Sequence, residues 1–120
     1  MFDDKFMQLL QAGGPQVQAE FFLRFLEDLR ATRHGIVTAA SNSDWQGINH
    51  NSHILLSLAG TIGATTVYDM AKHLNTQSTL QIGTMNATLP YPLELVRETD
   101  ALIQKIVTYS ESLFAKRASK

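Results

Sequence analysis

Apolar side chains recur at steps of three and four residues along most of the chain, and this spacing restricts the possible fold more than any other feature. The clearest run extends from Val17 to Leu29 and contains Phe21, Phe22 and Phe25. Such spacing is typical of a helix with one buried face, whereas a strand would alternate apolar and polar residues. The tetrapeptide 79–82 does alternate, but a single short strand would have no partner. The pattern therefore predicts an all-α chain.

Residues that favour turns separate five helical segments. The expected helices are 3–12, 15–40, 44 to 60 or 63, 65–74 and 93–115. Ser43 and Gln46 have the spacing of a capping box at the start of the third helix. Residues 75–92 lack periodicity and contain prolines, so they predict a long connection. We expect a single domain over residues 1–120, an up-and-down four-helix bundle with its core at about 15–115 and a short additional N-terminal helix.

Composition excludes several classes of protein. Ten basic residues against eleven acidic ones create no field that would draw the chain to nucleic acid or to a membrane surface. The absence of cysteine removes disulfides, thiolate zinc sites and cysteine nucleophiles together. No apolar run approaches the roughly 18–20 residues that a spanning helix needs. We therefore expect a cytoplasmic protein that binds neither nucleic acid nor membrane.

The third predicted helix has an unusual exposed face. At 100° per residue, the side predicted to face the core contains Ile48, Leu55, Leu58, Ala59 and Ile62, with Asn51 as a polar exception. The opposite side, which we call the histidine strip, contains Gln46, His50, His53, Ser57 and Gly60, with Asn49 and Leu56 at its edge.

The composition of this strip points to chemistry at an imidazole. Exposed helical faces are normally filled with Lys, Glu, Gln or Arg, which are good helix formers. Here Ser57 and Gly60 instead leave a low surface beside His53, which suits a group that another protein's active site must reach. An imidazole nitrogen is also a good nucleophile near neutral pH, as reversible phosphate transfer requires.

The segment around His53 resembles the signature of a known family. It reads His53-Ile54-Leu55-Leu56-Ser57-Leu58-Ala59-Gly60-Thr61-Ile62-Gly63-Ala64. The histidine-containing phosphotransfer (HPt) family has roughly His-x-Leu-Lys-Gly-x-Ala-Gly-x-x-Gly-Ala. The matching positions are His53, Leu55, Ala59, Gly60, Gly63 and Ala64. As architecture the resemblance covers about residues 15–115, but its specific part is 53–64.

This resemblance implies that His53 takes a phosphoryl group from a receiver-domain aspartate and passes it to another receiver. The partners would be receiver domains of response regulators or hybrid sensor kinases, and monomer is the expected state of the chain. The family has no cofactor of its own, since the receiver supplies magnesium. The chain would be a phosphotransfer intermediate rather than a free-standing catalyst.

Two positions depart from the family pattern. The lysine three residues after the histidine is Leu56 here, and the next glycine is Ser57. The lysine is expected to offset the charge of the phosphoryl group, which a leucine cannot do. His50, one turn before His53, and Lys72 are the alternative sources of positive charge, and the sequence alone does not place Lys72.

The alternatives to phosphotransfer stay open. The missing lysine favours a degenerate HPt-like module that docks on a receiver or sensor kinase and regulates without carrying phosphate. A third hypothesis is an unrelated helical adaptor in which both histidines are ordinary surface residues. His50 and His53 are also too few to hold a metal ion, because protein sites usually supply three or four ligands, so we expect no metal site.

Overall fold

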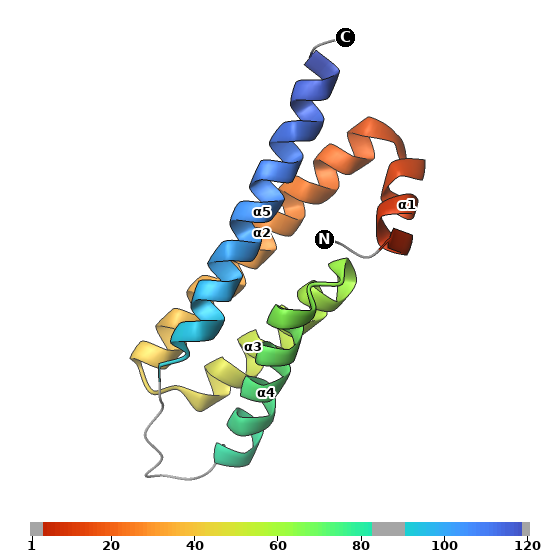
Figure 1. The fold of residues 1–120 in the computed structure, drawn as a ribbon. Coiled ribbons are helices and arrows are strands. Elements are labelled where there is room, and N and C mark those ends of the chain that lie inside the picture. The colour runs from red at the N-terminus through yellow and green to blue at the C-terminus, as the bar shows by residue number, and fades with distance from the viewer. Residues whose placement is uncertain (1–3, 83–90, 119–120) are drawn as a thin grey trace.

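The chain folds into an elongated bundle of helices (Figure 1). A computed structural model describes residues 4–82 and 91–118, and within these ranges all regular secondary structure is α-helical. The helices are α1 (Asp4–Ala12), α2 (Gly14–Ser41), α3 (Trp45–Ile62), α4 (Thr65–Gln81) and α5 (Leu93–Ala118). The prediction of an all-α bundle with a short additional N-terminal helix is confirmed.

The four longer helices form a closed ring of neighbours. α2 packs against α3 and α5, and α4 also packs against α3 and α5. α2 and α5 are longer than the α3–α4 hairpin and extend past its upper end, where α1 folds back beside the start of α2 (Figure 1). The molecule therefore measures 60 × 23 × 19 Å.

One hydrophobic core connects the helices. Fully buried side chains come from α2, α3 and α5, among them Leu29, Ile48, Leu55 and Ile106, and α4 adds the small Ala71. Burial of each large aliphatic side chain contributes roughly 1.5–3 kcal/mol to folding. The phenylalanines of α2 extend this core towards the α1 end. Their rings form three contacts with centroids 5.4–5.5 Å apart, Phe21–Phe22, Phe21–Phe25 and Phe22–Tyr109.

An ion pair joins α2 to α5 at the surface. The Arg33 guanidinium donates two hydrogen bonds to Asp100, with Nε–Oδ1 2.6 Å and Nη2–Oδ2 3.1 Å. The hydrogen bond to Asp100 raises the pKa of Arg33 above its ordinary value. Both side chains are more than one third exposed, and a pair of this kind contributes about 1 kcal/mol or less.

The capping box predicted for the third helix is wrong. Ser43 has a positive φ of 52°, and the N-cap is Asp44. The Asp44 carboxylate accepts a hydrogen bond from the backbone N–H of Gly47, with 3.0 Å between oxygen and nitrogen. A side chain on Gly47 would collide with this carboxylate and with Ala39 of α2. The helix still begins within one residue of the predicted start.

The predicted end of the fourth helix is also wrong, because α4 continues from Leu74 to Gln81. In this last part, which lacks apolar periodicity, the side chains of Asn75, Ser78 and Thr79 form hydrogen bonds with α3. Of the remaining predicted connection, Ile82, Tyr91 and Pro92 are described and lie outside the helices. Residues 83–90 lie outside the described residues.

A set of hydrogen bonds between α3 and α4 explains the polar stretch. We call it the Asn49–Asn75 network; its side chains are Asn49, Ser52, Asn75, Ser78 and Thr79. The two hydrogens of Asn49 Nδ2 are shared among the Asn75 carbonyl, Ser78 Oγ and Thr79 Oγ1, at 3.3, 3.1 and 2.8 Å from the nitrogen. In return, Asn75 Nδ2 donates to the Asn49 carbonyl and to Ser52 Oγ, at 3.0 and 3.2 Å. Ser52 and Ser78 are fully buried, so these bonds satisfy groups that water cannot reach.

The polar exception on the core side of the third helix has a counterpart on α2. Asn51 lies against Gly35, where any side chain would collide with the Asn51 amide. The amide also donates to the Gly47 carbonyl, with 2.8 Å between nitrogen and oxygen. Gly35 therefore makes the space in which the half-buried Asn51 fits between α2 and α3.

We expect the Asn49–Asn75 network to contribute measurably to stability. Asn49→Ala and Asn75→Ala should each lower the free energy of unfolding by about 1–3 kcal/mol, because buried partners lose their hydrogen bonds. The double variant should cost less than the two single changes together, since the residues bind each other. Urea unfolding followed by circular dichroism measures all three values.

Gln77→Ala is the matched control, because Gln77 is an exposed residue of the same helix. Its effect should stay within about 0.5 kcal/mol. Equal effects of Asn75→Ala and Gln77→Ala would contradict a stabilising role for the network.

Candidate functional site

The histidine strip lies on the outer side of α3, as the helical spacing predicts. Gln46, His50, His53, Ser57 and Gly60 are all exposed. Within the part of the chain that the structure describes, neither imidazole forms a hydrogen bond or an ion pair. The ring nitrogens of His50 and His53 are therefore open to solvent or to a partner.

The opposite side of α3 packs into the core. Ile48, Leu55, Ala59 and Ile62 are buried to within 1% of full coverage, while Leu58 is half-buried. Ser52, the residue before His53, is also fully buried in the Asn49–Asn75 network. The backbone that bears His53 is thus fixed by packing on one side and by hydrogen bonds to α4 at its edge.

Several residues of the HPt-like segment have a clear role in the fold. Leu55 and Ala59 are completely buried in the core. Gly63 ends α3 in the left-handed region, with φ 74°. There Ala64 N–H donates to the Ala59 carbonyl at 2.9 Å, and Gly63 N–H donates to the Gly60 carbonyl at 3.4 Å. This is the Schellman arrangement that commonly closes a helix at glycine.

Gly60 and Tyr68 form a hollow at the far end of the strip. The hollow is lined by Ala59, Gly60, Gly63, Ala64, Thr65 and Tyr68. A Cβ on Gly60 would contact the Tyr68 ring at 3.4 Å, so the ring lies directly beside the glycine. Gly60 is seven residues from His53, which places the hollow about 10 Å along the helix axis. Sequence reasoning did not single out Tyr68, because only the pairing of α3 with α4 places it there.

The position that holds a lysine in the HPt signature is occupied in this chain by a residue that packs against the core. Leu56 is half-buried and packs against the core, so it lies at the edge of the strip rather than on it. The neighbouring Ser57 is exposed, and its carbonyl accepts a hydrogen bond from the Thr61 hydroxyl at 2.9 Å. α3 contains no Lys, Arg, Asp or Glu, so any fixed charge near His53 must come from another helix.

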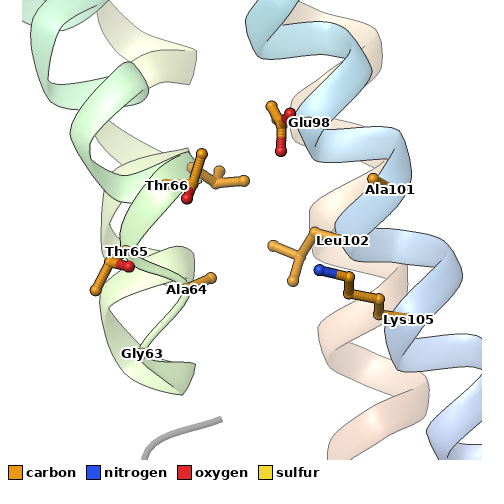
Figure 2. A pocket seen from close by; sticks show the side chains of 9 residues that line it. Gly63, Ala64, Thr65, Thr66, Glu98, Ala101, Leu102 and Lys105 are labelled. Carbon is orange, nitrogen blue, oxygen red and sulfur yellow. The ribbon is translucent and has the colours of Figure 1, made fainter. Parts of the chain in front are cut away.

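A separate pocket of about 160 Å³ lies between the first turn of α4 and α5 (Figure 2). Figure 2 shows the Lys105 side chain and Leu102 extending from α5 towards this space, with Glu98 farther along α5. Thr65 and Thr66 line the α4 side. The pocket includes no residue of the histidine strip and therefore belongs to a different face of the bundle.

The remaining histidines lie apart from the strip. His34 of α2 is within 3.5 Å of the Thr38 hydroxyl, measured from Nε2 to Oγ1. His73 of α4 lines a groove with Tyr91 to Leu95 at the start of α5. In residues 4–82 and 91–118, no three histidine or carboxylate side chains gather closely enough to hold a metal ion. The same helices include none that is long and apolar enough to cross a membrane.

Comparison with models of known protein families, with curated proteins and with solved structures finds no match to this chain. Its function must therefore be argued from the geometry of the strip.

The two glycines of the HPt-like segment should respond differently to alanine. Gly63→Ala should lower the free energy of unfolding by about 1–2 kcal/mol, because alanine is strained at a positive φ. Gly60→Ala, the matched control, should leave stability unchanged or raise it by up to about 1 kcal/mol, because Gly60 is exposed and helical. Urea unfolding of both variants measures the difference. Equal losses would contradict the separate roles assigned to the two positions.

Proposed function

We propose that this chain is a phosphorelay intermediate that carries a phosphoryl group on His53 between receiver-domain aspartates. The observation that carries the proposal is the state of His53 itself. Its imidazole is exposed and unpartnered within the described residues, on a helix whose other side is buried. Leu55, Ala59 and Gly63 of the HPt-like segment serve packing and helix termination, whereas His53 has no such structural role.

The proposed reaction needs only the imidazole and an aspartyl phosphate. The unprotonated ring nitrogen attacks phosphorus while the other nitrogen keeps its proton. A P–N bond forms, and the P–O bond to the aspartate breaks with its electron pair left on the carboxylate. The reverse sequence delivers the phosphoryl group to the next receiver. Positioning and charge stabilisation account for most of the catalysis of such transfers, and magnesium in the receiver supplies part of it.

The surroundings of His53 suit approach by a second protein. Ser57 and Gly60 follow it on the exposed side and are among the smallest side chains available. The hollow beside Tyr68 lowers the surface further at that end. The partners we propose are receiver domains of response regulators or of hybrid sensor kinases, met in the cytoplasm by a monomer of this chain.

One observation favours a second candidate function. Leu56 takes the place of the family's lysine and is half-buried against the core. A chain that has lost this charge could bind a receiver through the same strip and regulate it by occupancy, with no phosphate transferred.

Labelling by phosphorylated receivers separates the two functions. Incubation with a panel of radiolabelled phospho-receivers should transfer label to the wild type, in a form that acid removes and base does not. His53→Ala should carry no label, because its nucleophile is gone. Binding of the receivers to both proteins is measured in parallel by calorimetry.

His50→Ala is the matched control, since it removes the other exposed imidazole of the same strip. It should still be labelled. Receiver binding without label on the wild type would overturn the phosphocarrier function and support the regulatory module. Label that persists in His53→Ala would show that another residue carries the phosphoryl group, and would overturn the assignment to His53.

A further inference from the structure

The contacts between α3 and α4 determine which residues of the two helices lie opposite each other. Asn49 Nδ2 donates to Thr79 Oγ1 at 2.8 Å, near one end of the pair. Gly60 lies against the Tyr68 ring near the other end. Asn49 and Gly60 are as far apart in sequence as Tyr68 and Thr79, so the two helices keep the same antiparallel register between these contacts.

This register places Lys72 opposite Leu56. Leu56 follows Asn49 by seven residues on α3, and Lys72 precedes Thr79 by seven residues on α4. Seven residues are about two turns, so each side chain returns to nearly the same side of its helix. Because Asn49 and Thr79 are in contact, Leu56 and Lys72 are the corresponding pair two turns further along.

Position 56 is the position where the HPt signature has its lysine. It lies about one turn, or about 5 Å along the axis, from His53. Lys72 is exposed, whereas Leu56 is half-buried. A lysine stem can lie along apolar surface while its ammonium stays in water, so Lys72 can cross the edge of Leu56 towards the strip.

Three other charged or titratable groups on α4 and α2 are directed elsewhere. On α4, Asp69 and His73 line the groove towards the start of α5, and Lys72 does not. On α2, the contact of Gly35 with Asn51 brings Arg33 to the level of His53, but Arg33 is bound to Asp100 of α5. Lys72 itself forms no ion pair with any residue in the described ranges.

We infer that the Lys72 ammonium contacts the phosphoryl group on His53 and supplies, from α4, the positive charge that Leu56 cannot supply from α3. This inference rests on the phosphocarrier function. Lys72 would stabilise the dianionic phosphoryl group as it arrives and while it resides on the imidazole. A charge-assisted hydrogen bond of this kind is about twice as strong as a neutral one.

The inference is tested with phosphoramidate, a small donor that needs no receiver. An imidazole nitrogen attacks its phosphorus, the P–N bond to the amine breaks, and ammonia leaves. The phosphorylated fraction is followed with time by intact-protein mass spectrometry, with His53→Ala defining the background. Lys72→Gln should be phosphorylated about tenfold more slowly than the wild type, and Lys72→Arg should keep most of the rate.

Two further variants separate a local effect from a general loss of positive charge. Lys105→Gln is the matched control, because Lys105 is an exposed lysine in the α4–α5 pocket (Figure 2). It should behave as the wild type. The double variant Leu56→Lys with Lys72→Gln should regain the wild-type rate, because a lysine on α3 then supplies the positive charge that α4 has lost. Thermal unfolding checks that each variant is folded.

The outcomes distinguish failure of this inference from failure of the proposed function. Equal rates for the wild type and Lys72→Gln, with His53 still labelled, would overturn the role of Lys72 and leave the carrier function standing. Equal losses in Lys72→Gln and Lys105→Gln would also overturn it. A wild type that takes no label at His53 from phosphoramidate or from phospho-receivers would overturn both proposals.

Discussion

The pairing of α3 with α4 through the Asn49–Asn75 network is the constraint on which the site depends. Apolar packing alone tolerates sliding of one helix along another, because one aliphatic contact resembles the next. Reciprocal amide–carbonyl bonds, with two buried serine hydroxyls, are satisfied in one register only. That register brings Tyr68 against Gly60 and Lys72 opposite Leu56. The network thus turns a generic helical hairpin into a defined surface around His53.

Much of the architecture could be predicted from the spacing of apolar residues. The run from Val17 to Leu29 lies in α2, as predicted, because it depends on periodicity within one helix. On α3 the histidine strip is exposed and Ile48, Leu55, Ala59 and Ile62 are buried, as predicted, whereas Leu58 is half-buried and the buried Ser52 was not predicted. The same argument placed His50 and His53 together on the exposed side. These features are local, so the sequence of one segment contains the information that decides them.

What could not be predicted depends on contacts between segments. The polar residues after Leu74 have no apolar period, and their helix is stabilised by partners on α3. Asn51 is compatible with a buried face only because Gly35 of α2 leaves room for its amide. At the start of α3, Ser43 has the right residue type for a cap, but its positive φ leaves that role to Asp44. The positions of Tyr68 beside Gly60 and of Lys72 opposite Leu56 likewise depend on the register between α3 and α4.

The histidine strip occupies a single face of a single helix, and His53 lies near its middle. A partner protein whose active site encloses the imidazole would also cover the turns on both sides of it. Under the proposed function, the donor and the acceptor of the phosphoryl group therefore cannot be bound at the same time. Transfer would follow substituted-enzyme kinetics, and an excess of either partner in its unreactive form would act as a competitive inhibitor of the other.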